Sequence, residues 1–267
     1  MATPIGNLGD ISPRAIEILG DCGLIIAEDT RTAGLLLERF KIPRKSVISF
    51  FEGNEKKKLS YIIQKVKAAG RSALITEAGT PCVSDPGYRL INILREEAVE
   101  IIPVPGPCAA MAALSASGIA SDRFAFEGYL PKNNKKLRDA LRGLKREKRT
   151  LIFYESPKRI RNSLETMKDI LGNRKACLFR EMTKIYEESI FGTLSEILEK
   201  LQSEPRGEIT MVVGACGETD KTDYDFEKIF SIIRDEAGIS GSKAAKIAAK
   251  ITGLRKRDIY RAAARKD

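Results

Sequence analysis

Two apolar segments in the first half of the chain each run directly into a turn rich in glycine and proline, and a helical pattern follows each turn. The first reads A-L-I-T-E-A-G-T-P-C-V-S-D-P-G-Y over 73–88, and the second reads I-I-P-V-P-G-P-C-A-A over 101–110. In an open α/β sheet, ligands bind where loops leave the carboxyl ends of strands. Consecutive tight turns at a sheet edge would explain the first loop alone. The second loop opens a helix N-terminus, whose free N–H groups suit a ligand, so the pair predicts a pocket for a sizeable cofactor.

Short apolar runs alternate with amphipathic helical patterns through the first half of the chain. The expected helices cover 12–19, 32–40, 55–69, 88–96 and 105–118, and the expected strands cover 24–27, 47–51, 73–76 and 100–104. Such alternation predicts a parallel sheet with helices on both faces. In the second half, strands are expected over 125–128, 150–154, 175–180, 188–192 and 208–214, with helices over 136–144, 157–171 and 194–201.

Composition divides the chain further. We expect an N-terminal α/β domain over 1–118, a second α/β domain over 119–217, a polar linker over 218–225 and a basic helical tail over 226–267. In the tail, a helix beginning at Ser242 and a last basic helix are separated by Gly253, which resembles a helix-turn-helix.

The formal net charge of +10 is concentrated in two segments. Residues 132–149 contain nine Lys or Arg against two acidic residues, and residues 243–267 contain the same numbers. A solvated helix face would explain either segment alone. Two such segments favour a nucleic acid as partner, because Lys and Arg displace the counterions of phosphates.

Several classes of protein are disfavoured by what the chain lacks. It has no histidine, the commonest general base and metal ligand, so we expect no metal site. Its five cysteines form no C-x-x-C pair, and no apolar run is long enough to cross a bilayer, so we expect a reduced, cytoplasmic protein without a membrane partner. No P-loop or dinucleotide-binding glycine motif is present, which argues against a P-loop kinase or NTPase and an ordinary NAD enzyme.

A series of motifs runs in order along the chain. They are A-T-P-I-G-N-L-G-D-I-S-P-R-A (2–15), A-E-D-T-R (27–31), E-A-G-T-P (77–81), S-D-P-G-Y (84–88), P-V-P-G-P-C-A-A (103–110), F-E-G-Y-L-P (126–131), R-T-L-I-F-Y-E-S-P (149–157), R-E-M-T-K (180–184) and G-E-I-T-M-V-V (207–213). Together they closely resemble the members of the tetrapyrrole methylase family that methylate ribosomal RNA.

The resemblance implies two α/β domains of the tetrapyrrole methylase type with a cofactor cleft between them, plus a small C-terminal helical domain. It implies a homodimer that binds S-adenosylmethionine and methylates the ribose 2′-hydroxyl of a cytidine in 16S rRNA of the small ribosomal subunit. Carried over by motif, the cofactor should contact both loops, the second domain and the N-terminal segment. The matching residues are Gly79, Thr80, Pro81, Ser84, Cys108, Ala109, Tyr154, Met182, Thr210 and Pro4, with Pro4 to Gly6 near the reacting methyl.

Two positions depart from the family pattern. Met1 stands where the family's first strand should end, so we expect that strand to be missing, with a gap in the sheet that loosens the cofactor cleft. The family usually has Asp before A-G-T-P, whereas this chain has Glu77. The carboxylate is kept, but its reach changes by one methylene.

A ribose hydroxyl is a weak acid, so its methylation needs a base or a nearby cation. Without histidine, the candidate bases are the carboxylates at the ends of the expected strands: Glu28, Asp29, Glu77, Glu155 and Glu181. We favour Glu77 or Asp29 as the catalytic base, with Lys184 and Arg31 stabilising developing negative charge. For each residue, a structural ion pair or a turn cap is the competing interpretation.

Other functions remain open from the sequence. A methyltransferase of the same fold acting on a tetrapyrrole or in the diphthamide pathway would explain the loops but not the basic tail. A non-enzymatic nucleic-acid-binding protein would explain the tail but not the loops.

Overall fold

The computed structural model describes residues 1–201, 205–217, 226–236, 238–252 and 255–263. Contacts divide the chain into two compact units, Met1–Ala215 and Cys216–Asp267. The expected linker over 218–225 and the helix break at Gly253 lie outside the described residues. Within the described ranges, no helix is both long enough and apolar enough to cross a membrane.

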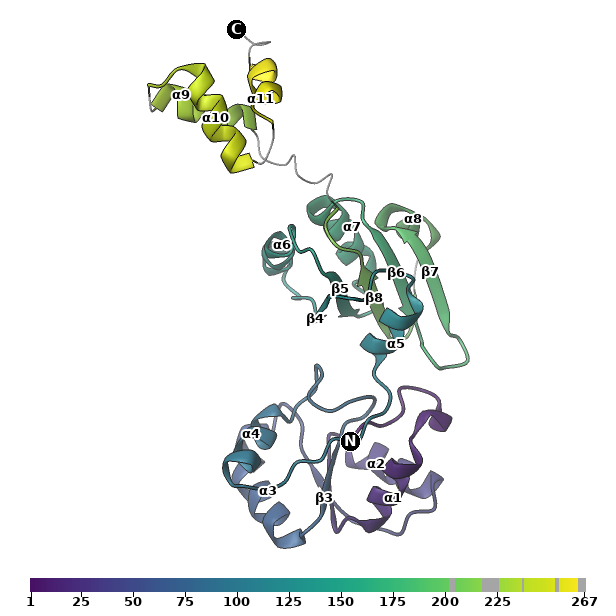
Figure 1. Ribbon diagram of the computed structural model, residues 1–267. Helices are drawn as coiled ribbons and strands as arrows, with labels where there is room; N and C mark the ends of the chain where they lie inside the picture. Colours follow the sequence, from purple (N-terminus) through teal and green to yellow (C-terminus); the bar gives the residue numbers. More distant parts are fainter. Residues whose placement is uncertain (202–204, 218–225, 237, 253–254, 264–267) are drawn as a thin grey trace. The chain divides into compact units, whose positions relative to one another are not determined.

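The first sheet has three parallel strands in the order β2-β1-β3. Figure 1 shows β3 with α3 and α4 on one side and α1 and α2 on the other. Its central strand is buried along its whole length, as expected for a parallel sheet covered on both faces. One apolar cluster joins one face to α1 and α2, and a second joins the opposite face to α3 and α4. The elements are η1 (Leu8–Asp10), α1 (Pro13–Asp21), β1 (Leu24–Ala27), α2 (Thr30–Arg39), β2 (Ser46–Ser49), α3 (Glu55–Ala69), β3 (Ser72–Ile75) and α4 (Tyr88–Glu96).

Local sequence signals explain where these helices begin and end. Ser12 caps α1 by accepting a hydrogen bond from the Ala15 N–H, and Pro13 follows at the first helical position. Asp29 caps α2 in the same way, so this helix begins two residues earlier than expected. Gly70, at φ +69°, ends α3 at the predicted place.

The expected strand over 100–104 is wrong. Residues 99–108 have no regular structure, and the helix expected from Pro105 begins only at Ala109, as α5 (Ala109–Ala116). Alternating prolines at 103, 105 and 107 remove backbone donors and disfavour helical geometry before each proline. The first residues of the chain lie between this segment and β3, because the Met1 amino group donates to the Leu74 carbonyl and the Ala2 N–H donates to the Val104 carbonyl.

The second sheet has five strands in the order β4-β5-β8-β6-β7. β4 and β5 are parallel, and the remaining pairs are antiparallel. A large apolar cluster packs one face against α6, α7 and α8, and a smaller one packs the other face against α5. The elements are β4 (Phe124–Tyr129), α6 (Asn134–Gly143), β5 (Thr150–Glu155), α7 (Ile160–Leu171), β6 (Lys175–Arg180), β7 (Glu188–Thr193), α8 (Leu194–Lys200) and β8 (Ile209–Val213).

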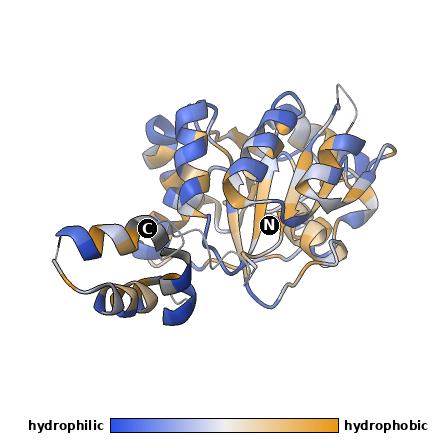
Figure 2. Cartoon of the chain, turned by 90° about the horizontal axis from the view of Figure 1, so that it is seen from above, coloured by the Kyte–Doolittle hydropathy of each residue, from blue (hydrophilic) through white to orange (hydrophobic). Residues whose placement is uncertain are grey.

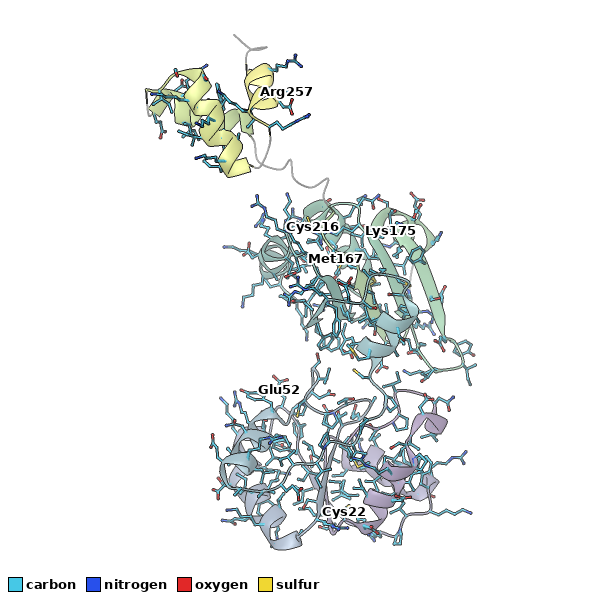
Figure 3. All side chains as sticks on the ribbon, viewed as in Figure 1. Cys22, Glu52, Met167, Lys175, Cys216 and Arg257 are labelled. Carbon is cyan, nitrogen blue, oxygen red and sulfur yellow. The ribbon has the colours of Figure 1, made fainter. Side chains whose placement is uncertain are left out.

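The core lies between these layers. In Figure 2 the strands are largely orange and the outer sides of the helices largely blue, which is the pattern expected when helices cover a buried sheet. Cys22, in the core around the first sheet, and Met167, in the core around the second sheet, are almost completely buried. Both are labelled in Figure 3. The prediction of two α/β parts followed by a helical C-terminal region is confirmed.

The C-terminal unit consists of α9 (Phe226–Glu236), α10 (Gly241–Thr252) and α11 (Lys256–Ala263). The three helices pack around a small apolar core of Phe230, Ala244, Ala245, Ala248 and Ile259. Lys243, Lys246 and Lys250 are exposed and recur at helical spacing along one side of α10, and Arg255, Lys256, Arg257 and Arg261 are exposed as well.

Candidate cofactor and active site

Carboxylates gather at the carboxyl ends of β1 and β3, as the parallel pairing requires. Glu28 directly follows β1, and Glu77 lies two residues beyond the end of β3. The Thr76 hydroxyl donates to a Glu28 carboxylate oxygen at 2.7 Å, which joins the two strand ends. The Glu77 N–H also lies 3.5 Å from the same Glu28 carboxylate, so the ends of these two strands bring Glu28 and Glu77 close together.

The N-terminal segment crosses these strand ends and docks on the loop between β6 and β7. Thr3 and Gly79 exchange two backbone hydrogen bonds, of 2.9 and 3.1 Å. Beyond them, the Asn7 N–H donates to the Thr183 hydroxyl at 3.0 Å. A Cβ on Gly6 would lie 2.5 Å from Lys184 Cγ, so only glycine allows this close approach.

The two glycine- and proline-rich loops are joined to each other and to the second sheet. The Thr80 hydroxyl donates to the Pro107 carbonyl at 3.0 Å. Ser84, which has a positive φ of 64°, approaches Gly128 so closely that a Cβ there would lie 2.9 Å from the serine hydroxyl. Gly128 lies at a register shift in β4, where its own positive φ makes room for this contact.

The wall on the second sheet is aromatic. Tyr129 and Tyr154 contact edge to face, with ring centroids 5.5 Å apart. The Tyr154 hydroxyl accepts a hydrogen bond from the Ala110 N–H at 3.2 Å, so one donor at the start of α5 is already satisfied by the protein. Thr210 lies directly opposite Tyr154 in the pairing of β5 with β8.

These elements enclose a cavity of about 350 Å³. Seven of the ten predicted cofactor residues line it: Gly79, Thr80, Ser84, Cys108, Ala109, Tyr154 and Thr210. Pro4 lines an adjoining cavity of about 560 Å³ instead. Pro81 lines neither cavity, and Met182 packs against the apolar cluster beneath α5.

The four favoured catalytic residues divide into two groups. Glu77 borders both cavities, and Lys184 borders the larger one. Asp29 and Arg31 line neither cavity, and pair with each other through several hydrogen bonds. The hydrogen bonds of Arg31 lower the pKa of Asp29 to about 2. So weak a base is poorly suited to accept a proton near neutral pH.

The remaining candidate carboxylates hold structural contacts. Glu155 is buried and accepts from Arg159, from the Ser163 hydroxyl at 2.6 Å and from the Ser156 N–H at 2.7 Å. Glu181 accepts from the Glu208 N–H at 2.9 Å and from Lys184 at 3.0 Å.

Lys184 also donates to Glu208 at 3.0 Å. Burial lowers its pKa, but the hydrogen bonds to Glu208 and Glu181 outweigh that effect and leave the pKa above its ordinary value. The lysine is therefore a fixed cation whose charge two carboxylates already balance.

Burial and mutual repulsion raise the pKa of two carboxyl groups at the smaller cavity. Burial, followed by the charge of Glu28, raises the pKa of Asp85 to about 6. The same two causes, in the same order, raise the pKa of Glu77. Burial likewise raises the pKa of Tyr154, so its hydroxyl stays neutral at pH 7.

Sequence reasoning did not select several residues that line the smaller cavity, and the three with ionisable or aromatic side chains are Asp85, Tyr129 and Glu208. Each belongs to one of the motifs noted above: S-D-P-G-Y, F-E-G-Y-L-P and G-E-I-T-M-V-V. An acidic residue beside Ser84 was a usable signal for Asp85. Nothing in the local sequence indicated that Tyr129 and Glu208 would face the loops after β3 and before α5.

The raised pKa of Asp85 has a consequence for stability. Between pH about 4 and about 6, the folded chain retains a proton that the unfolded chain has released, so this group's contribution to stability falls as the pH rises through that interval. An Asp85→Asn variant cannot ionise. We expect it to be more stable than wild type at pH 8, on the order of 1 kcal/mol after allowance for solvent at this half-buried site.

Urea unfolding of both proteins at pH 4, 6 and 8 measures this difference. We expect the two proteins to be nearly equal at pH 4 and to diverge up to pH 8. Because the pKa of Glu77 in the same cavity is raised as well, the observed transition belongs to Glu77 and Asp85 together. A difference that is the same at all three pH values would contradict the assignment.

Comparison with known proteins places this geometry in a known family. The family model described as tetrapyrrole (corrin/porphyrin) methylases matches residues 2–198. The chain belongs to the tetrapyrrole methylase family. Two solved structures of tetrapyrrole methylase fold resemble it: diphthine synthase, with a TM-score of 0.60 and 13% identity over 79% of this chain and 87% of that one, and uroporphyrin III C-methyltransferase from Thermus thermophilus, with a TM-score of 0.56 and 18% identity over 82% and 96%.

Three relatives of higher identity carry one name. A protein of Haemophilus influenzae named ribosomal RNA small subunit methyltransferase I is 42% identical, over 97% of this chain and 93% of its own length. Proteins of the same name from Escherichia coli and Pasteurella multocida are each 40% identical over 97% of this chain, and this chain covers 91% and 94% of their lengths.

Proposed function

We propose that this chain is an S-adenosylmethionine-dependent methyltransferase that methylates the ribose 2′-hydroxyl of a cytidine in 16S rRNA of the small ribosomal subunit. The observation that carries the proposal is the cavity of about 350 Å³, lined by both loops and by Tyr154 and Thr210. Seven of the ten cofactor residues expected by motif line it, which supports the proposal. Relatives at about 40% identity along nearly the whole chain carry the name of a ribosomal RNA methyltransferase.

The residues present suit S-adenosylmethionine. This cofactor carries a sulfonium and an ammonium group, and Glu28, Glu77 and Asp85 make the cavity negative. Gly79 and Ala109 expose backbone that a nucleoside can approach, and Tyr129 and Tyr154 offer aromatic faces. We assign cofactor contacts to Gly79, Thr80, Ser84, Cys108, Ala109, Tyr154 and Thr210.

When bound, S-adenosylmethionine supplies an electrophilic methyl group on a sulfonium. This chain's residues then have two tasks, which are to orient the acceptor hydroxyl and to receive its proton. Glu77 suits the second task, because it borders both cavities and its pKa lies above the ordinary value. Lys184, held by Glu181 and Glu208, provides a fixed positive charge near the acceptor oxygen.

The exposed lysines and arginines of the C-terminal unit suit the phosphates of rRNA, and those of residues 132–149 supply a second basic surface. Phosphate contacts of this kind position a protein on RNA without reading its sequence. We further infer that the protein works in the cytoplasm and forms a homodimer. Sedimentation analysis of the purified protein tests the homodimer.

We expect the double substitution Lys246→Ala/Lys250→Ala to weaken binding to small ribosomal subunits about 10-fold and to reduce the salt dependence of log K by roughly 1 to 2 units of slope. Both lysines are exposed on one side of α10. Lys56→Ala/Lys57→Ala on α3 removes the same charge from the other unit and serves as the control. Fluorescence titrations at several salt concentrations measure both effects. Equal slopes for the two double variants would contradict the role of α10.

The function is tested with small subunits from a strain that lacks this methylation. The purified protein and labelled S-adenosylmethionine should transfer one methyl to 16S rRNA, and alkali-resistant cleavage should locate it on a cytidine ribose. Calorimetry should show that S-adenosylmethionine binds the protein in the absence of RNA. Binding of the cofactor without transfer to rRNA would overturn the proposed substrate, and an absence of binding would overturn the enzyme class.

A further inference from the structure

The larger cavity, of about 560 Å³, is not explained by the cofactor residues. It shares Ile5, Thr76–Ala78 and Glu208 with the smaller cavity, so the two meet along the segment that follows β3. Glu77 borders both. The volume of the larger cavity falls in the range of small-molecule sites and is ample for one nucleotide.

We propose that this cavity receives the acceptor nucleotide of the RNA, with the base against α2, a flanking phosphate on Arg39 and the ribose hydroxyl toward Glu77. The inference rests on the proposed function, in which the smaller cavity holds the methyl donor. It adds a second binding site, which combines the N-terminal segment with residues 32–39 of α2, a stretch that no cofactor motif includes.

The apolar part of the wall suits a base. Leu35 and Leu36 of α2 line the cavity together with Leu8 of η1, and Leu35 leaves 67% of its surface exposed. A large apolar side chain exposed beside a cavity gains contact when a planar ring covers it. A base drawn out of single-stranded RNA provides such a ring.

The charges of the wall suit one phosphate. Arg39, in the last turn of α2, is exposed and takes part in no ion pair found among the described residues. The other cation of the wall, Lys184, is held by Glu181 and Glu208. A guanidinium without a carboxylate partner matches the paired oxygens of a phosphodiester. Glu77 and Glu208, in contrast, would repel a ligand that carries many carboxylates.

The opposite side of the cavity is held in place before any ligand binds. Gly6 packs against the 182–184 loop, where the Asn7 N–H donates to the Thr183 hydroxyl. Thr183 in turn donates its own N–H to the Glu187 carboxylate at 3.0 Å. A preformed wall lowers the ordering cost of binding one nucleotide.

The probe for the test is 2′-deoxycytidine 3′,5′-bisphosphate, which lacks the acceptor hydroxyl and so stays unreacted. It is titrated into the full chain with saturating S-adenosylhomocysteine, and leucine methyl signals are followed by NMR. We expect the signals of Leu35 and Leu36 to shift and saturate. Arg39→Ala should raise the dissociation constant about 10-fold, the loss expected for a hydrogen-bonded charge pair.

Arg44→Ala is the matched control, because Arg44 is an exposed arginine of the same sheet region that lines neither cavity. It should leave the dissociation constant within about 2-fold of wild type, the scatter expected for an unrelated surface change. Leucine signals that do not move, or equal losses in the two arginine variants, would overturn the inference. If wild type transfers no methyl to small subunits, the proposed function fails. If it does, and Arg39→Ala transfers at the rate of Arg44→Ala, only the acceptor site fails.

Discussion

A Gly6→Ala variant should lose about 100-fold in the rate of methyl transfer while remaining folded. The added Cβ would lie 2.5 Å from Lys184 Cγ, 2.7 Å from Thr183 Oγ1 and 3.2 Å from the Met182 carbonyl oxygen. These atoms cannot all move aside, because Thr183 accepts the Asn7 N–H. The N-terminal segment must therefore shift by a good part of an ångström. A displacement of about 1 Å at a reacting centre can cost about 100-fold in rate.

Gly20→Ala is the control for this variant. Gly20 lies inside α1, and a Cβ there would meet nothing within 4 Å. This substitution should leave the rate unchanged and stabilise the chain by roughly 0.5–1 kcal/mol, because alanine favours a helix over glycine. Single-turnover rates and urea unfolding measure both properties. A Gly6→Ala rate within 3-fold of wild type would show that the contact with Lys184 and Thr183 does not position the segment.

A Glu155→Ala variant should lose about 3–5 kcal/mol of unfolding free energy. The Glu155 side chain is almost completely buried and accepts from Arg159, Ser163 and the Ser156 N–H. Its removal leaves the Arg159 guanidinium without a counter-charge at the carboxyl end of β5. This guanidinium also donates to the Leu130 carbonyl. The loss is large because a charge left without its partner inside the protein costs more unfolding free energy than the intact ion pair contributes.

Asp139→Ala provides the comparison, since Asp139 forms an exposed pair with Arg142 and its loss should cost less than 1 kcal/mol. Glu155→Gln separates stability from catalysis. It retains most of the side chain's volume, and its transfer rate at low temperature should equal that of wild type. A rate that falls while the urea midpoint stays constant would instead identify Glu155 as a base, one of the roles considered from sequence.

The bounds of a helix or strand can be predicted closely from sequence where residues near its ends determine them. The bounds of β1, α3 and α4 agree with the expected ones, because apolar periodicity and, for α3, the terminating Gly70 act within a few residues. The segment over 100–104 fails for the opposite reason. Its apolar residues are typical of a strand, but a strand forms only where a neighbour pairs along its length. The first residues of the chain give this segment one backbone hydrogen bond, from the Ala2 N–H to the Val104 carbonyl.

The residues of the candidate site likewise include some that local sequence predicts and some that depend on long-range pairing. The glycine- and proline-rich loops and the carboxylates after β1 and β3 could be read from the chain, since each follows its own strand. Tyr129 and Glu208 could not, because they reach the cavity through the order β4-β5-β8-β6-β7, a long-range pairing. Likewise, the sequence made both Asp29 and Glu155 candidate bases and favoured Asp29, whereas in the structure Asp29 pairs with Arg31 and Glu155 is buried against Arg159.

By itself, the order of residues determined the family, the two loops and the basic character of the tail, because these depend on residue types and spacings along the chain. Only the tertiary structure decided which carboxylates share a cavity. It also decided that residues of α2 line a second cavity beside the first. Charge, burial and pKa depend on distances between residues far apart in the chain, and those distances exist only once the sheets have paired.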